Sequence, residues 1–341
     1  MELHVMAAGR KLPDVQRYAT AVEDAGLDGM VFVESGRTAY LSVAAAALAA
    51  PSLEYSTGIA VAFPRSPMVT AKVAWELQDV TQGRFRLGLG TQVRAHIERR
   101  YGVEFDPPGP RIREYIEAVK SIFPAFRGEE KLAFDGDYHE LSLLPAMWSP
   151  GAIEFDDPPV DVAAVGPWMV RMAGAVADGV HVHPFHSRRY LDERLLPGLR
   201  DGADGAGRSV DDLTLSVPVF TIVGDTEEER AQWRERARFQ IGFYGSTKNY
   251  AFMFDMLGFD GTSAALNEKL KAGDLPGMAA CITDEMLEAF AVESTWDGLG
   301  DALGNKYDGI ADRLILYFAE DLYAADPSTL EKFGRVAAAL R

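Results

Sequence analysis

A short apolar run followed by a helix-like stretch recurs throughout this chain, and this alternation constrains the fold more than any other feature. Near the N-terminus, ELHVMAA alternates as a strand does, and PDVQRYATAVEDAG then repeats its apolar residues at helical spacing up to Gly26. Later runs such as GMVFVES are continuously apolar, as strands buried on both faces of a parallel sheet are. The predicted strands cover residues 2–8, 29–35, 53–63, 84–90, 160–166, 178–184, 213–224 and 312–320. Eight strand-helix units predict an α/β fold of the (β/α)8 type, a TIM barrel.

Two stretches interrupt this alternation. Residues 128–158 are rich in proline, glycine and short β-prone pieces, so we interpret them as an insertion after the fourth helix. Residues 246–300 have a mostly helical pattern with several glycines and form an excursion before the eighth strand. Because α/β barrels of this length commonly form one domain, we expect residues 1–341 to be a single TIM-barrel domain with these two additions.

A doubly wound sheet is the rival interpretation of the same alternation, and it would favour a dinucleotide-binding fold. That fold needs a Gly-x-Gly-x-x-Gly turn after its first strand, whereas AAGRKLPD follows the first strand here. The segment GLGTQV at the end of the fourth strand contains Gly88 and Gly90 but lacks the third glycine. The barrel is therefore the favoured fold.

The charge and the cysteine content narrow the classes of partner and location. Aspartate and glutamate (51) outnumber lysine and arginine (34), which gives a formal net charge of −17. Such an excess repels phosphate backbones and anionic membranes, so we expect no nucleic acid and no membrane partner. Cys281 is the only cysteine, which excludes an intramolecular disulfide and a Cys-rich metal site. With no signal-like N-terminus and no long apolar span, a cytoplasmic location is expected.

Active sites of (β/α)8 barrels lie at the C-terminal ends of the strands, so the residues that directly follow each strand are the candidates. Glu34 lies at the end of the second strand, where burial would raise the pKa of a carboxyl group toward a range useful for proton transfer. The alternative is a carboxylate that braces a loop. His96 follows the fourth strand and reaches the barrel mouth if a helix begins there; the alternative is a surface histidine.

The fifth strand ends in a turn that suits anion binding. Gly166 precedes Pro167, which fits the first turn of a helix. The exposed N–H groups of Trp168 and Met169 would then point, with the helix dipole, at an anion above the barrel. This pattern indicates a phosphate seat, although a tight turn that only needs glycine is the alternative.

The segment HVHPFH places three histidines within six residues. Imidazoles two residues apart on a strand share a face, so His181 and His183 raise the question of a metal. No matching acidic or histidine pair stands out at another strand end, so we predict no metal site and interpret these histidines as polar lining of a substrate pocket. Motifs typical of hydrolases and kinases are also missing, and a barrel with glycine-lined strand ends and few acid-base groups suits a cofactor that carries the chemistry itself.

Three segments together resemble a known family. These are RSPMVTAKVAWELQDVTQGRFRLGLGTQ, PPVDVAAVGPWMVRMAGAVADGVHVHPF and FQIGFYGSTKNY. They are similar to the luciferase-like monooxygenase superfamily, and within it to the oxidoreductases that use the deazaflavin coenzyme F420. The resemblance implies a (β/α)8 barrel with an insertion, which agrees with the strand count, and a cofactor ring held across the barrel mouth. The implied cofactor is F420, with FMN as the alternative.

The resemblance also implies which residues bind the cofactor. A non-proline cis peptide at the end of the third strand, which matches Gly58-Ile59 here, would back the ring. Thr91, Gln92 and His96 in the loop after the fourth strand would contact the ribityl chain and the phosphate.

Other residues complete the implied site. Gly90 lets the backbone approach the ligand at the mouth, and Glu34 faces the reactive ring. Gly166, Trp168 and Met169 complete the phosphate site. Hydride transfer also needs one proton donor or acceptor nearby, and the candidates are Glu34, His96 and His183 in that order.

The sequence departs from one branch of the family at two positions. The sugar-phosphate dehydrogenases carry a histidine where this chain has Ser35, and a glutamate where it has Val93. Both of these proton-handling groups are missing, which argues against glucose 6-phosphate as the substrate.

Three functional hypotheses follow. The first is an F420-dependent oxidoreductase that transfers a hydride between the deazaflavin C5 and a small organic substrate, an alcohol, a carbonyl or an activated double bond. The second is a two-component FMN monooxygenase that uses oxygen and reduced flavin supplied by a reductase partner. The third is a barrel that binds a flavin or deazaflavin without turnover. A homodimer is expected from the resemblance alone.

Overall fold

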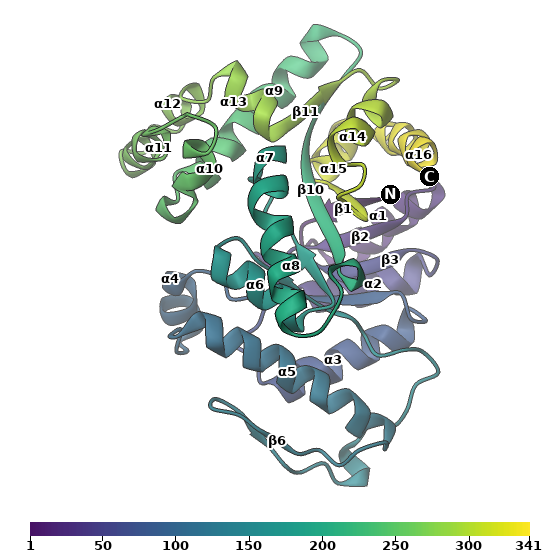
Figure 1. The fold of residues 1–341 in the computed structure, drawn as a ribbon. Coiled ribbons are helices and arrows are strands. Elements are labelled where there is room, and N and C mark those ends of the chain that lie inside the picture. Colours follow the sequence, from purple (N-terminus) through teal and green to yellow (C-terminus); the bar gives the residue numbers. More distant parts are fainter.

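Eight parallel strands form a closed barrel in the computed structural model, which describes all 341 residues (Figure 1). They are β1 (Glu2–Ala7), β2 (Gly29–Phe32), β3 (Glu54–Thr57), β5 (Phe85–Gly90), β8 (Val160–Ala163), β9 (Gly179–His181), β10 (Thr214–Val223) and β12 (Arg313–Leu316). Each strand pairs in parallel with the next in that order, and β12 pairs with β1 to close the ring. A short strand, β4 (Ala60–Val61), continues the line of β3 along β5. The predicted TIM barrel is confirmed.

Helices follow the barrel strands and cover the outside of the ring. They are α1 (Leu12–Asp24), α2 (Ala39–Ala49), α3 (Pro67–Val80), α4 (Arg94–His96) with the π-helical turn η1 (Ile97–Tyr101), α5 (Pro108–Arg127), α6 (Pro167–Val176), α7 (Arg188–Tyr190) with the π-helical turn η3 (Leu191–Leu195), α8 (Leu196–Gly205), α9 (Glu227–Gly245), α15 (Ala319–Ala325) and α16 (Thr329–Leu340). A short 3-10 turn, η4 (Val210–Asp212), precedes β10.

Local sequence explains these elements. The strand β2 is buried at all four residues, which is why its sequence is apolar without alternation. Helix α9 begins at a capping box, in which the Thr226 hydroxyl accepts a hydrogen bond from the Glu229 N–H (3.2 Å) and the Glu229 carboxylate accepts one from the Thr226 N–H (3.2 Å). Helices α1, α3, α5 and α6 carry a proline in their first turn, where no N–H is needed. The helix N-termini and the burial of β2 therefore follow from the residues found there.

The stretch between α5 and β8 forms an extended flap at the lower end of the molecule in Figure 1. It contains an antiparallel pair, β6 (Phe134–Asp135) with β7 (Glu140–Leu141), and the 3-10 turn η2 (Ala146–Trp148). The Glu114 carboxylate of α5 fixes the hairpin, because it accepts hydrogen bonds from the N–H groups of Asp137 (2.7 Å) and Tyr138 (2.8 Å).

The stretch between α9 and β12 is mostly helical, with one strand that the sequence did not predict. It contains the 3-10 turn η5 (Lys248–Tyr250), α10 (Ala251–Asp255), α11 (Thr262–Lys271), α12 (Leu275–Ala280), α13 (Asp284–Phe290), β11 (Ala291–Ser294) and α14 (Leu299–Tyr307). The strand β11 pairs in parallel with Phe220–Val223, the part of β10 that extends beyond the barrel. Figure 1 shows α10 to α13 as an arm beside the barrel.

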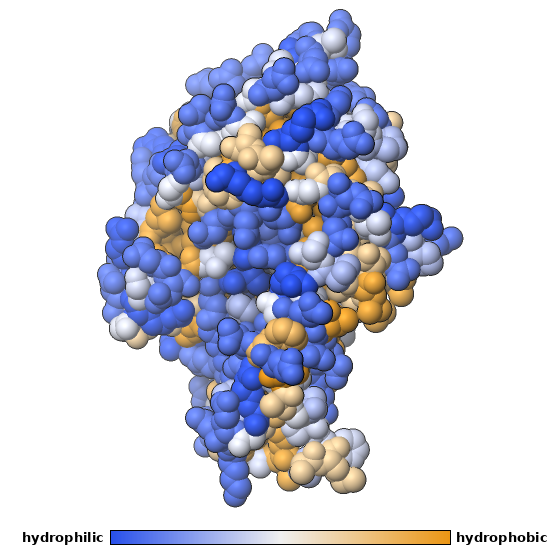
Figure 2. Space-filling view, turned by 90° about the vertical axis from the view of Figure 1, so that its right-hand side faces the viewer, coloured by the Kyte–Doolittle hydropathy of each residue, from blue (hydrophilic) through white to orange (hydrophobic).

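The surface is largely polar. On the face shown in Figure 2, hydrophilic residues dominate and apolar ones gather in a few patches in its middle and lower parts. No helix is both long enough and apolar enough to span a membrane. A continuous core of 85 buried residues includes the barrel strands and the inner faces of the helices.

Candidate active site

Backbone lines part of the barrel mouth between β3 and β5. The Gly58-Ile59 peptide, directly after β3, is cis without a proline, which confirms the expectation from the resemblance. A Cβ atom on Gly90 would lie 2.7 Å from Cδ1 of Ile59, and one on Gly58 would lie 2.3 Å from Cγ1 of Val31. Both positions therefore favour glycine. Gly58 and Ile59 are partly exposed, so this stretch of main chain faces the mouth without bulky cover.

Glu34, after β2, is bound to Arg65 in the loop after β4. Its carboxylate accepts hydrogen bonds from both terminal nitrogens of Arg65 (2.8 and 2.5 Å) and from the Val61 N–H (2.7 Å). Burial acts to lower the pKa of Arg65, but the hydrogen bonds and charge of Glu34 raise it above its ordinary value. The Arg65 guanidinium also lies 5.0 Å above the ring of Tyr40. Through this ion pair and the Val61 N–H, Glu34 braces two mouth loops.

The loop after β5 carries the predicted cofactor contacts Thr91 and Gln92. Gln92 adopts a left-handed conformation with φ of 58°, which is uncommon for a residue with a side chain. Its side-chain oxygen accepts a hydrogen bond from the Val93 N–H (2.9 Å), and its carbonyl accepts one from the Thr91 hydroxyl (3.1 Å). Both residues are partly exposed, while Val93 is half exposed (50%). The turn thus presents main chain and short polar groups beside the Gly58-Ile59 peptide.

His96 lies in the short helix α4 that opens from this loop. Its ring is exposed, and Nδ1 lies 3.4 Å from a terminal nitrogen of Arg100. The other terminal nitrogen of Arg100 donates a hydrogen bond to the Ser35 carbonyl (2.6 Å) after β2. The loop after β5 is therefore tied to the loop after β2, and His96 lies near that junction.

The predicted anion seat lies at the N-terminus of α6, next along the barrel from β5. Gly166 is the N-cap and no side chain caps the helix. Pro167 occupies the first turn, and Trp168 is substantially exposed (44%). The N–H groups of the first turn are therefore available to a ligand, as helix N-termini that bind phosphate are.

The two histidines of the sixth barrel strand lie in different environments. His181 ends β9 inside the barrel at 5% exposure, and its Nδ1 would lie 3.4 Å from a Cβ on Gly58. Burial lowers its pKa to about 4, although Asp161 acts against this. His181 is therefore buried beneath the Gly58 peptide, whereas His183, two residues past the end of β9, is partly exposed; that both line a substrate pocket stays a prediction.

His183 lies at the mouth among tyrosines that the sequence analysis did not identify as site residues. Its ring is 4.8 Å from that of Tyr244 and 4.6 Å from that of Tyr250. The Tyr244 hydroxyl lies 2.7 Å from the hydroxyl of Tyr317. Tyr317 directly follows β12, so the rule that site residues follow barrel strands would have found it if the strand had been ended at Leu316.

The order of strands places two of the candidates across the mouth from each other. Glu34 follows β2 and His183 follows β9, and these strands are four steps apart in either direction around the eight-stranded ring. His96, Gly90 and Gly166 follow or end strands on one of the two arcs between them. The candidates therefore surround the mouth rather than form one hydrogen-bonded cluster.

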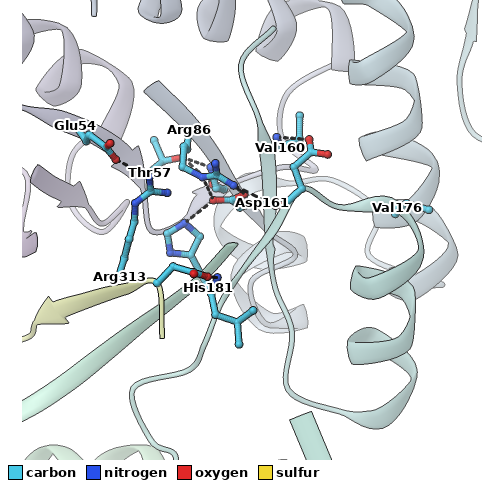
Figure 3. A network of polar contacts seen from close by, with 12 residues as sticks. Glu54, Thr57, Arg86, Val160, Asp161, Val176, His181 and Arg313 are labelled. Atoms are coloured by element: carbon cyan, nitrogen blue, oxygen red, sulfur yellow. Dashed lines mark hydrogen bonds and ion pairs between the residues drawn. The ribbon is translucent and has the colours of Figure 1, made fainter. Parts of the chain in front are cut away.

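A polar network fills the barrel below the mouth (Figure 3). Asp161 is fully buried and accepts two hydrogen bonds from Arg86 (2.9 and 2.6 Å). Arg313 pairs with both Glu2 and Glu54 (2.6 Å each) near the strand starts. The carboxylates of Glu2 and Glu54 and the ring of His4 have the spacing of a metal site, but the Arg313 guanidinium already contacts both carboxylates. This network lies at the end of the barrel that usually serves stability.

The fold and the mouth define a barrel protein whose site is built on strand ends and backbone. A family model described as "Luciferase-like monooxygenase" matches residues 2–313. Because this match covers most of the chain, the protein belongs to the luciferase-like monooxygenase family.

Known relatives resemble the chain over different lengths. An uncharacterized protein of Mycobacterium tuberculosis is 37% identical over 93% of each chain. An F420-dependent glucose-6-phosphate dehydrogenase of Nakamurella multipartita is 30% identical over 48% of this chain and 47% of its own. The solved structure of the coenzyme F420-dependent tetrahydromethanopterin reductase from Methanopyrus kandleri superposes with a TM-score of 0.79, covers 98% of this chain and 97% of its own, and is 19% identical. At 19% identity, the likeness to the reductase structure shows a shared fold.

Proposed function

We propose that this protein is an F420-dependent oxidoreductase that transfers a hydride between the deazaflavin and a small uncharged organic substrate, an alcohol, a carbonyl or an activated double bond. Family membership supports an oxidoreductase with a flavin or deazaflavin cofactor. The partial match to an F420-dependent dehydrogenase supports F420 over FMN.

One structural observation carries the proposal: the partly exposed cis peptide Gly58-Ile59 and the uncapped N-terminus of α6 lie on either side of β5, whose Gly90 packs beneath the Ile59 side chain. The strands β3 and β4, which flank the Gly58-Ile59 peptide, both pair with β5, and β5 pairs with β8, which leads to α6. A planar ring needs a flat surface without projecting side chains, and a phosphate needs free N–H groups at a helix end. The residues present therefore fit a cofactor with both parts.

Different residues around the mouth would contact the ring, the phosphate and the chain between them. When bound, the deazaflavin supplies a hydride acceptor or donor at its C5. Gly58, Ile59 and Gly90 form the surface against which the ring rests. The N–H groups of Trp168 and Met169, with Gly166 as the N-cap, bind the phosphate, and Thr91 and Gln92 contact the chain between ring and phosphate.

The structure changes the order in which we rank the three candidate proton donors or acceptors. Glu34 is engaged by Arg65 and the Val61 N–H, so it positions the loop that carries Gly58-Ile59. His96 is exposed at the rim and serves the cofactor chain. His183 lies beside the mouth with one ring nitrogen free, so it becomes the first candidate to contact the reacting part of the substrate.

A cofactor titration tests the proposal. Purified protein is titrated with F420 and separately with FMN, and binding is followed by cofactor fluorescence. We expect saturable F420 binding at least tenfold tighter than FMN binding, and exchange of a deuteride between reduced F420 and an uncharged ketone from a substrate panel. Tighter FMN binding with oxygen consumption would support the monooxygenase, and F420 binding without exchange across the panel would support a binding protein.

A further inference from the structure

Four partly exposed ring side chains gather at the C-terminal ends of β9, β10 and β12. His183 follows β9, Tyr317 follows β12, and Tyr244 and Tyr250 come from α9 and the turn after it. The His183 ring contacts Tyr244 edge-on and Tyr250 at a tilt. The buried ring of Phe220 in β10 packs edge-on against Tyr317 at 4.8 Å. The cluster thus has an apolar base and an accessible polar rim.

Two hydroxyl groups on this rim form a pair. The oxygens of Tyr244 and Tyr317 lie 2.7 Å apart, and either can be the donor. Two hydroxyls carry two protons, and their mutual hydrogen bond uses one. The second proton is available to a third oxygen. Burial raises the pKa of both phenols above their ordinary value, so both stay protonated at neutral pH.

His183 supplies a second neutral donor on the same rim. Its Nδ1 accepts a hydrogen bond from the Phe185 N–H (3.1 Å), so the ring proton lies on Nε2. That nitrogen has no hydrogen-bond partner in the protein, and it is not sealed away from solvent. Burial lowers the pKa of His183 to about 3, so the imidazole is neutral in the working range. A neutral imidazole donates a hydrogen bond to a carbonyl without bringing a charge.

We propose that the Tyr244–Tyr317 hydroxyl pair and the Nε2–H of His183 form the oxygen-binding site of the enzyme, which takes an uncharged substrate with a carbonyl or hydroxyl oxygen on the reacting carbon. This rests on the proposed function, which supplies the hydride. In the reducing direction, the C=O π bond breaks, a C–H bond forms with the hydride, and the oxygen takes a proton from one phenol. That phenol regains a proton through its partner hydroxyl from solvent. Oxidation of the alcohol runs the same steps in reverse.

The charge of the surroundings defines the substrate class. The polar atoms of the cluster belong to three phenols and one neutral imidazole. Of the cations on the flanking elements, Arg236 is paired with Asp321 and Arg10 with Glu320, while Lys248 of η5 is exposed to solvent. A carboxylate substrate would give up its hydration without gaining a countercharge, whereas a ketone loses little on entering such a site. The site therefore favours ketones and secondary alcohols over organic anions.

The test uses the protein without cofactor and cyclohexanone labelled at the carbonyl carbon. Hydrogen bonds lower the carbonyl stretching frequency, so infrared spectra report them directly. We expect a lowered frequency in the natural protein, a smaller shift in Tyr317→Phe and Tyr244→Phe, and a Kd about 5- to 10-fold higher in each, as loss of one hydrogen bond gives. Cyclohexanecarboxylate should bind at least tenfold more weakly than cyclohexanone.

The matched control is Tyr55→Phe, which removes a hydroxyl that donates to the Ala50 carbonyl at the other end of the barrel. It should leave the carbonyl frequency and the Kd unchanged. Equal frequencies and affinities in all four proteins, or no ketone binding to the natural protein, would overturn the assignment. F420 titration of the same proteins separates the two proposals: a protein that binds F420 and exchanges hydride normally after both tyrosine changes keeps the proposed function and refutes the oxygen site.

Discussion

Glu34 and Arg65 form a two-point ion pair that joins the loop after β2 to the loop after β4, with N–O distances of 2.5 and 2.8 Å. The Glu34 carboxylate is 5% exposed and the Arg65 side chain 22%. The pair therefore lies mostly out of water, where the loss of one partner leaves the other without compensation. It also fixes the main chain next to Gly58-Ile59, through the Val61 N–H.

Removing one partner of this pair should weaken both the fold and cofactor binding. For Glu34→Gln we expect about 2 kcal/mol less free energy of unfolding, somewhat below the loss for a fully buried pair, because the Arg65 side chain is still 22% exposed. The F420 Kd should rise, because the loop behind the ring loses its anchor. Urea unfolding and F420 titration measure the two effects. Arg113→Ala, which breaks the exposed Arg113–Glu117 pair, is the control and should change neither by more than about 0.5 kcal/mol.

Gly90→Ala should separate cofactor binding from stability. The added methyl would lie 2.7 Å from Cδ1 of Ile59, so the Ile59 side chain must move. Crowding of this size costs about 1–3 kcal/mol of stability, and Ile59 would be displaced into the surface proposed to support the ring. We expect a folded protein with at least a tenfold higher F420 Kd. Gly205→Ala meets no atom within 4 Å and should bind F420 normally; equal loss in both variants would refute the predicted ring surface.

The buried histidines should make the protein sensitive to acid. Burial lowers the pKa of His186 to about 4, and that of His181 likewise, against an ordinary value of 6.5. Between these values the unfolded chain binds more protons than the folded one, so stability is full above about pH 6.5 and falls as the pH drops toward 4. Each such histidine lowers the free energy of unfolding by up to about 1.4 kcal/mol for every pH unit below 6.5, down to about pH 4.

His186→Gln tests this pH dependence. His186 contacts the His183 carbonyl (2.9 Å) and the Tyr307 hydroxyl (3.2 Å), and an amide replaces these contacts without titrating. We expect the free energy of unfolding to fall less steeply between pH 6.5 and 4, because the variant takes up as much as one proton fewer on unfolding. Above pH 7 the difference between the two proteins should be constant. Parallel curves at all pH values would show that His186 does not titrate as described.

The barrel was predictable from the sequence because each of its strands is a run of buried apolar residues between helices with helical periodicity. The strand β11 was missed because only the first two residues of Ala291–Ser294 are apolar and buried, and it exists because β10 runs past the barrel. The tyrosines were missed for a related reason. The eighth strand was predicted to residue 320, which placed Tyr317 inside a strand instead of after it.

Side-chain partners were harder to predict than strand ends. Glu34 and Arg65 are 31 positions apart, and only the closed barrel brings their loops together. The separate fates of His181 and His183 depend on where β9 ends, which periodicity sets only within a few residues. Sequence reasoning therefore located the mouth and its backbone, whereas the contacts that decide the state of each titratable group came from the fold.

The Arg86–Asp161 pair below the mouth should show the cost of breaking a buried ion pair inside the barrel. Asp161 is fully buried, and Arg86 donates to both of its oxygens (2.9 and 2.6 Å) and to the Asp178 carbonyl (3.2 Å). For Asp161→Asn we expect a loss of about 3–5 kcal/mol in the free energy of unfolding, because Arg86 remains charged without its partner. The double variant Asp161→Leu with Arg86→Met should lose less than either charge removed alone, since no unpaired charge is left. Urea unfolding of Asp161→Asn, Arg86→Met and the double variant decides this, and a double variant that is less stable than Asp161→Asn would show that the pair contributes net stability to the barrel.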